Sequence, residues 1–136
     1  MGEQRLRWTG DGLQFLGNAA YGEPLEIGGD TLGRGAKPSD LLPLSLAACT
    51  AYDVVEILRK QRQDLLGLEV VAISEQDPDP PWTFRSIHLR FQLTGTVDAS
   101  KAAKAVEIAE TRYCAVAATI RSVVRLTHEV MIVPNE

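Results

Sequence analysis

Residues 37–64, KPSDLLPLSLAACTAYDVVEILRKQRQD, contain no glycine and decide the fold. The stretch is almost wholly apolar up to Leu58 and charged after it, which predicts one long helix whose first half is buried. Proline is tolerated only in the first turn of a helix, so Pro43 places the N-cap at Asp40, with Ser39 as the alternative. The basic residues that follow Leu58 suit the C-terminal turn of such a helix.

Short strands joined by tight turns are expected before this helix, where glycines separate brief β-prone runs. After it, apolar and polar residues alternate over 84–95, which indicates a half-exposed strand. A second helix follows, with an apolar stripe of alanine and valine and with Asp98 or Ser100 as its cap. Because strands and helices are segregated along the chain, the expected class is α+β, in a single domain covering residues 1–136. The other expected elements are strands at 5–8, 13–16, 24–27, 68–75 and 125–133 and a short helix beginning near Cys114.

Composition excludes several classes of protein. The chain has 136 residues, of which 45% are hydrophobic and 24% charged, the balance of an ordinary globular domain. Its net charge of −4, without a basic run, argues against nucleic acid as a partner. The longest apolar stretch, Leu41–Tyr52, is shorter than a bilayer span, and the N-terminus lacks the apolar segment of a signal peptide. We therefore expect a cytoplasmic protein without a membrane partner.

The sequence contains none of the common cofactor-binding or metal-binding motifs. The glycine-rich stretch at residues 28–40 contains no phosphate-binding loop, and the chain contains no G-x-S-x-G nucleophile elbow. The soft metal ligands are Cys49, His88, Cys114 and His128, and no two of them stand at the spacing of a ligand pair. We therefore expect neither a metal site nor a bound cofactor.

The two cysteines are the candidates for chemistry. Cys49 stands in the middle of the predicted long helix, with apolar neighbours toward the N-terminus and Asp53 and Glu56 toward the C-terminus. A thiol reacts as its thiolate, which needs a nearby cation or a helix N-terminus, so Cys49 is not activated within its own helix. An activating cation has to come from elsewhere in the fold. The candidates are Arg34, Lys37 and Arg112.

Cys114 has a different local setting, near a predicted helix start and two residues after Arg112, which favours a lowered pKa. Free cysteines are nevertheless among the most buried residues, so each of the two can be inert packing. By the same reasoning, Arg34 can be a plain surface charge. From the residues alone, structural cysteines and a redox couple both stay open.

Several motifs together resemble the OsmC/Ohr family of osmotically inducible and organic hydroperoxide resistance proteins. They are the helix stretch quoted above with its A-A-C-T-A-Y-D-V-V core, the following GLEVVAISE, a P-x-x-F strand that ends in Gly95, and the RYCAVAATI segment around Cys114. The resemblance covers roughly residues 33–133, and it is closest to the uncharacterised OsmC-like branch of the family.

The resemblance implies an α+β fold in which antiparallel sheets pack on long central helices and two chains intertwine as a homodimer. Cys49 would attack an organic hydroperoxide and become a sulfenic acid, and Cys114 would resolve it to a disulfide, which a dithiol such as a lipoyl group would reduce. An apolar wall from Leu42 and Leu46 would favour alkyl hydroperoxides over hydrogen peroxide.

The sequence departs from the family's peroxidases at one pair of residues. Those enzymes carry a Glu just after the proline that opens the helix and an Arg in an N-terminal loop; here Ser39 occupies the Glu position. Asp40 and Arg34 are either a shifted version of that pair or a helix cap and a loop charge. A non-peroxidatic protein that binds a small apolar or thiol-reactive ligand is therefore the alternative function.

Overall fold

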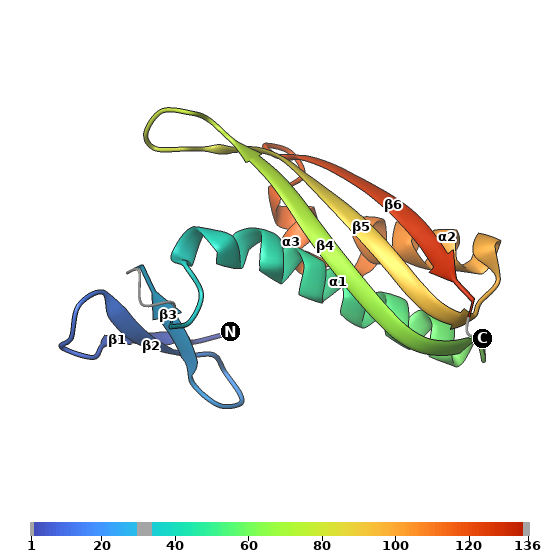
Figure 1. Ribbon diagram of the computed structural model, residues 1–136, viewed down its shortest axis with the longest axis horizontal. Helices are drawn as coiled ribbons and strands as arrows, with labels where there is room; N and C mark the ends of the chain where they lie inside the picture. Colours follow the sequence, from blue (N-terminus) through green and yellow to red (C-terminus); the bar gives the residue numbers. More distant parts are fainter. Residues whose placement is uncertain (1, 30–33, 135–136) are drawn as a thin grey trace. The chain divides into compact units, whose positions relative to one another are not determined.

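The computed structural model describes residues 2–29 and 34–134 and consists of two compact units that meet in the chain between Leu42 and Pro43. The first unit is an antiparallel sheet in the order β1-β2-β3 (Figure 1). Its strands lie within two residues of the predicted positions. Their bounds are β1 Arg5–Trp8, β2 Gln14–Asn18 and β3 Leu25–Gly28.

The long helix begins differently from the prediction. A single 3₁₀ turn, η1 (Pro38–Asp40), leads directly into α1 (Leu41–Lys60). Lys37 is the N-cap of this turn, with no side-chain capping bond. The prediction that Asp40 or Ser39 is the N-cap is therefore wrong. Pro38 takes the first helical position, where its missing N–H costs nothing, so the helical conformation starts before Asp40.

The buried residues of α1 form a stripe along the helix. The prediction that the first half of the helix is buried is therefore wrong. The buried residues recur at three- and four-residue spacing to the C-terminal end, whereas Leu44 and Tyr52 are 57% and 72% exposed. By length and composition alone, residues 38–60 would also suit a membrane span. The stripe shows instead that α1 is a core helix with a second, uncovered apolar face. The stripe consists of Pro43, Leu46, Ala47, Thr50, Val54 and Leu58.

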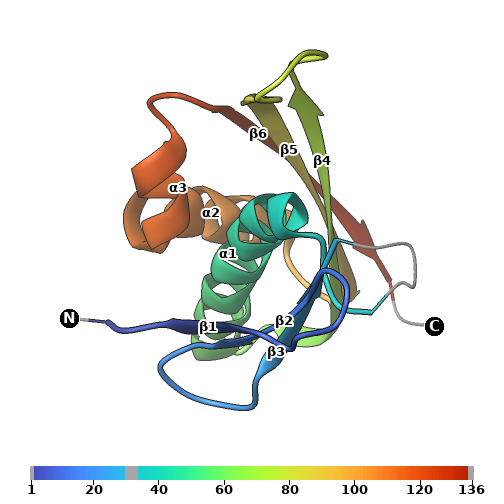
Figure 2. The same ribbon diagram turned by 90° about the vertical axis from the view of Figure 1, so that its left-hand side faces the viewer.

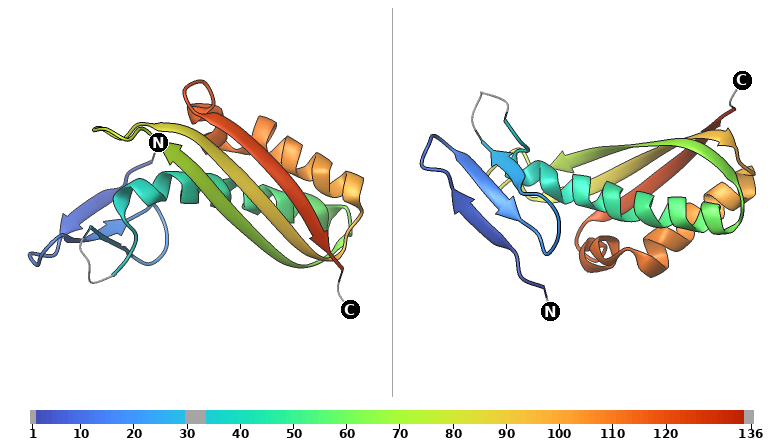
Figure 3. Two further views of the ribbon diagram at one scale, coloured as in Figure 1. Left: turned by 45° about the horizontal axis from the view of Figure 1, so that its top comes forward. Right: turned by 90° about the horizontal axis from the view of Figure 1, so that it is seen from below.

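The second unit is a sheet in the order β4-β5-β6 with helices on one face (Figures 2 and 3). The first two strands pair antiparallel and the last two pair parallel, with Phe91 opposite Val130. Parallel neighbours need a crossover, which the helical segments between β5 and β6 supply. The predicted α+β class and the closing strand at 125–133 are confirmed. The bounds are β4 Asp64–Gln76, β5 Phe84–Thr96, α2 Ala99–Ile108, the π-helical turn η2 Ala109–Tyr113, α3 Ala115–Ile120 and β6 Arg125–Val133.

The core of this unit lies between the sheet and the helices. The inward side chains of β5 are the predicted apolar set, all of them buried, and the small residues of the α2 stripe let that helix approach closely. Asp98 caps α2, as predicted, by accepting the Lys101 N–H at 3.0 Å. Gly95 has φ +135°, and a Cβ there would collide with the Asp64 carbonyl, so only glycine fits where β4 and β5 bulge.

Truncating the centre of the core should measure its contribution to stability. Phe91 is fully buried on the inner face of β5, so we expect Phe91→Ala to lower the free energy of unfolding by about 3–5 kcal/mol in urea denaturation. Met131 lies on β6 and is 48% exposed. Met131→Ala, the matched control, should change it by less than about 1 kcal/mol. Equal effects from the two substitutions would contradict this core.

Candidate functional site

Cys49 lies in the middle of α1 at the edge of the core. Its neighbour Thr50 is 1% exposed and faces inward, so successive residues of the helix turn Cys49 away from the core centre and leave it half-buried. Leu46, one turn before, is fully buried in the core. Leu46 therefore offers no surface to a substrate, and the predicted apolar wall does not include it.

Cys114 lies where the π-helical turn η2 ends and α3 begins. Its backbone is extended, its N–H donates to the Ala109 carbonyl at 2.9 Å, and its Sγ accepts the Ala117 N–H at 3.3 Å. The sulfur thus acts as the N-cap of α3. The residue is only 2% exposed. Cys114 is held in one place by the helix start that the sequence predicted.

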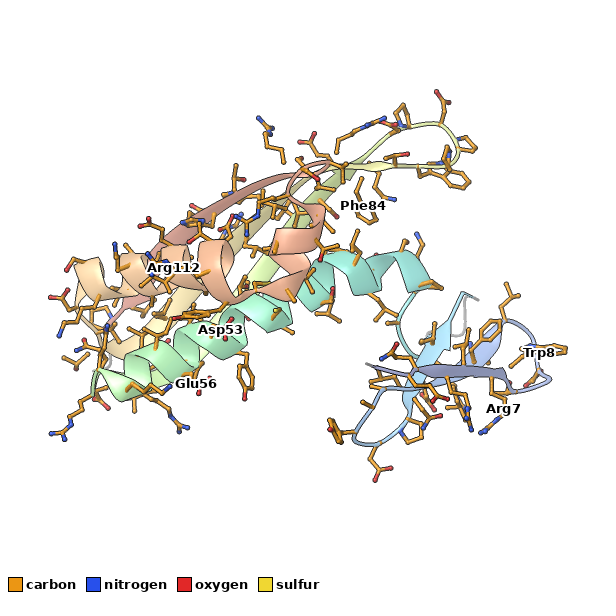
Figure 4. All side chains as sticks on the ribbon, turned by 180° about the vertical axis from the view of Figure 1, so that it is seen from behind. Arg7, Trp8, Asp53, Glu56, Phe84 and Arg112 are labelled. Carbon is orange, nitrogen blue, oxygen red and sulfur yellow. The ribbon has the colours of Figure 1, made fainter. Side chains whose placement is uncertain are left out.

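The two thiols lie close enough to interact. Burial of Cys114, together with its interaction with Cys49, raises the pKa of Cys114 to about 11, while the N–H of Ala117 acts in the opposite direction. Burial and the neighbouring thiol therefore both favour the protonated form of Cys114. The prediction of a lowered pKa at Cys114 is wrong, because burial outweighs the helix start and Arg112 lies exposed at the surface (Figure 4).

Of the four predicted site residues, the structure brings together Cys49 and Cys114 in the second unit. Arg34 belongs to the first unit, where it lines a hollow of about 280 Å³ together with Asp11 and Glu26. Asp40 lies exposed in η1 at the end of that unit. In the described part of the chain, no hydrogen bond joins a Lys or Arg side chain to Cys49.

A hollow of about 590 Å³ is lined by residues of α1 that follow Cys49 and by the residue before Cys114. It runs along α1 from Asp53, one turn beyond Cys49, and its opposite wall is Tyr113, the residue before Cys114. We call it the dithiol hollow. Sequence reasoning treated Asp53 as part of a helix face and missed Tyr113, although Tyr113 stands next to Cys114 in the RYC motif. The residues that line the dithiol hollow are Asp53, Glu56, Ile57, Lys60, Gln61 and Tyr113.

The dithiol hollow is acidic on the side of α1. Burial raises the pKa of Asp53, and the charge of Glu56 raises it further. Glu56 also pairs with Lys60 at 3.6 Å, whereas Asp53 has no ion pair with any described residue. The first two charged side chains after Cys49 along α1, those of Asp53 and Glu56, are therefore both carboxylates (Figure 4).

A second hollow of about 590 Å³ follows the uncovered face of α1 and is mainly apolar. Ala48 and Ala51 form its floor, and the exposed Tyr52 stands beside them. Small residues next to an exposed aromatic ring form a surface on which another helix can pack closely. We call this surface the α1 outer face. It consists of Ala48, Ala51, Tyr52, Val55, Glu56, Arg59 and Lys60.

The two histidines lie apart from the thiols, each with a carboxylate. His88 Nε2 is 3.0 Å from Glu129, and His128 Nδ1 is 2.6 Å from Glu110. Among the residues that the structure describes, no group of three or more His, Cys, Asp or Glu side chains is arranged to hold a metal ion.

Known proteins match this chain along most of its length. The family model for OsmC-like proteins matches residues 28–129. Protein YhfA of Escherichia coli K12 is 33% identical over 132 residues, which cover 96% of this chain and 98% of YhfA. Similarity at this level, over nearly the whole of both chains, extends to the N-terminal strands that the family model does not reach.

Solved structures share the fold. A hypothetical protein from Aquifex aeolicus superposes with a TM-score of 0.89 at 23% identity, over 100% of this chain and 98% of that one. The organic hydroperoxide resistance protein OsmC from Legionella pneumophila superposes with a TM-score of 0.68 at 18% identity, over 96% of both chains. These likenesses confirm the OsmC-like fold. The family match over residues 28–129 shows that the chain belongs to the OsmC-like protein family.

Proposed function

We propose that this protein reduces organic hydroperoxides in oxidative stress defence, with Cys49 as the attacking residue and Cys114 as the resolving residue. The observation that carries the proposal is the proximity of the two thiols inside the second unit, where Cys49 contributes to the raised pKa of Cys114. A redox couple needs its sulfurs close together before oxidation, so that the sulfenic acid is captured at once. Two unrelated packing cysteines have no need of this contact.

The proposed reaction uses the thiols of Cys49 and Cys114, one hydroperoxide and one external dithiol. The Cys49 thiolate attacks an oxygen of the hydroperoxide, the O–O bond breaks, and the alkoxide takes a proton and leaves as the alcohol. The Cys49 sulfenic acid then condenses with the Cys114 thiol, which forms the disulfide and releases water. A dithiol, for which a lipoyl group is the candidate, returns both sulfurs to thiols by two exchange steps and is itself oxidised to a disulfide.

Burial assigns the two roles. Cys114 is 2% exposed and its pKa of about 11 keeps it protonated near neutral pH, so it neither meets a hydroperoxide nor attacks one. Cys49 is only partly buried, so a hydroperoxide can reach its sulfur. The attacking and resolving roles therefore follow from the positions of the sulfurs.

A structure of the same fold supports organic hydroperoxides as the substrate class. The cation that activates Cys49 has to be proposed from this chain's own residues. The Legionella pneumophila structure of the same fold is named an organic hydroperoxide resistance protein. A cysteine peroxidase also needs a cation at its thiolate. We propose Arg34, with Asp40 as its positioning partner, because both belong to the segment before α1 where the family's peroxidases carry their Arg and Glu. A cytoplasmic location would supply the dithiol.

We further propose that the protein is a homodimer. The α1 outer face leaves apolar surface uncovered on a helix whose other side is in the core, and Leu44 is 57% exposed as well. In the first unit, Leu6 and Trp8 are 62% and 57% exposed on a strand with no buried residue. Surfaces of this kind are covered by a partner in stable proteins, and a second copy is the commonest partner.

One observation favours a second candidate function. Asp53 and Glu56 are the first charged residues after Cys49 on α1, and carboxylates disfavour a thiolate. A protein that binds a small apolar or thiol-reactive ligand, without turning over peroxide, would be compatible with this setting. The two functions differ in whether one equivalent of hydroperoxide converts the thiols to an intramolecular disulfide.

Cysteine substitutions test the proposed reaction. We expect wild-type protein to lose both thiols to one disulfide after one equivalent of cumene hydroperoxide, measured by thiol titration and intact mass. Cys49→Ser should react at the uncatalysed rate, because the attacking sulfur is gone. Cys114→Ser, the matched sulfur-to-oxygen control, should still react and gain the mass of one oxygen atom. Full activity in Cys49→Ser would refute the proposal, and survival of both wild-type thiols would favour the ligand-binding alternative.

The difference between the two thiols should appear in alkylation. The thiolate reacts with iodoacetamide, and the fraction of thiolate rises with pH through the pKa. Because the pKa of Cys114 is raised from 9.0 to about 11, its labelling should reach half-maximum near pH 11, whereas the partly exposed Cys49 should label faster near neutral pH because the reagent can reach it. Peptide mass spectrometry resolves the two sites. In urea both should label alike, and fast labelling of native Cys114 at pH 8 would contradict its placement.

The α1 outer face can be tested through the oligomeric state. We expect light scattering on a sizing column to give twice the 14.8 kDa of one chain for the wild type. A charge in the centre of the face, in Tyr52→Glu, should shift the population toward monomer, because a carboxylate cannot be buried there without a partner. Met131→Glu, on the outer face of the sheet, is the control. A monomeric wild type would contradict the homodimer.

A further inference from the structure

The dithiol hollow begins at Asp53, which follows Cys49 by one turn on the same face of α1, and its lining includes Tyr113, the residue before Cys114. Its volume of about 590 Å³ is that of a small-molecule site. Ile57 and the 63% exposed ring of Tyr113 give it apolar walls. An aryl or alkyl group extending from a peroxide oxygen at Cys49 would lie along these walls.

The charges of the dithiol hollow do not cancel. Lys60 is engaged by Glu56, and Asp53, closest to Cys49 in the helix, keeps a half-buried carboxylate with no described cation as its partner. The other cations nearby in sequence, Arg59 and Arg112, are exposed and do not line the hollow. An anionic ligand there would face a fixed negative charge at reduced dielectric.

We propose that Asp53, assisted by Glu56, is a specificity residue that selects uncharged organic hydroperoxides against those that carry a carboxylate. This inference rests on the proposed peroxidase function and adds the charge of the substrate to it. The selection works by repulsion between Asp53 and the carboxylate of a charged hydroperoxide. It needs no additional contact with the uncharged hydroperoxide. Neutral alkyl and aryl hydroperoxides would enter, whereas a hydroperoxide with a free acid group would be disfavoured.

A matched pair of substrates isolates this effect. Cumene hydroperoxide and its para-carboxylate differ by one charge and share the same reacting centre. The readout is the second-order rate constant for loss of the Cys49 thiol in a single turnover, which needs no reductant. We expect the wild type to prefer the neutral substrate by about fivefold or more at low salt, and this ratio to shrink as salt screens the repulsion.

The substitution Asp53→Asn keeps the size of the side chain and removes its charge. It should lower the preference ratio about fivefold, toward one. The ratio cancels any effect of the substitution on the reactivity of the Cys49 thiol itself. Glu69→Gln removes the same charge from an exposed position on β4, and it should leave the ratio unchanged.

The outcomes separate this inference from the function beneath it. Oxidation of the wild type by both substrates at equal rates would overturn the charge selection and leave the peroxidase function standing. A ratio that falls equally in Asp53→Asn and Glu69→Gln would also overturn it, because the net charge of the protein would then be the cause. Failure of both hydroperoxides to oxidise Cys49 would overturn the proposed function, and the specificity with it.

Discussion

The packing of α1 against the inner face of β5 determines where the two thiols lie. Its buried stripe sets the rotation of the helix, and Thr50 can face the core because its hydroxyl donates to the carbonyls of Leu46 and Ala47 at 2.9 and 3.1 Å. A polar residue satisfied by its own helix costs little when buried. With Thr50 turned inward, Cys49 must lie at the edge of the core, where the η2–α3 junction brings Cys114 against it.

That junction determines how the two sulfurs differ. The break between η2 and α3 makes Cys114 a helix cap whose sulfur accepts the Ala117 N–H. The same burial that keeps Cys114 protonated also shields it from external oxidants and thiols. One position in the fold therefore supplies a resolving thiol that is close to its partner and inaccessible to most others.

Sequence patterns correctly predict the features that depend on neighbouring residues, and they give wrong predictions for the features that depend on tertiary contacts. The alternation over 84–95, the stripe of α2 and the Asp98 cap each depend on neighbours in sequence, and the structure confirms them. The sequence predicts a lowered pKa for Cys114, because a helix start and Arg112 lie next to it in the chain. Its burial against Cys49, 65 residues away by numbering, is not visible there, and burial dominates. Burial of the first half of α1 is also wrong as a prediction, because tertiary contacts set the rotation of the helix and leave Leu44 exposed.

The carboxylates beside Cys49 constrain how the site can work. Asp53 and Glu56 are the first charged residues after Cys49 on α1, and the described part of the second unit places no Lys or Arg side chain in a hydrogen bond with Cys49. A thiolate at Cys49 therefore needs a positive charge brought by the segment before α1 or by a second chain. The reactivity of Cys49 toward hydroperoxides would then depend on whether that positive charge is in place. Without it, the two thiols would react slowly. The position of Asp53 thus gives the proposed dimer a chemical role in addition to covering apolar surface.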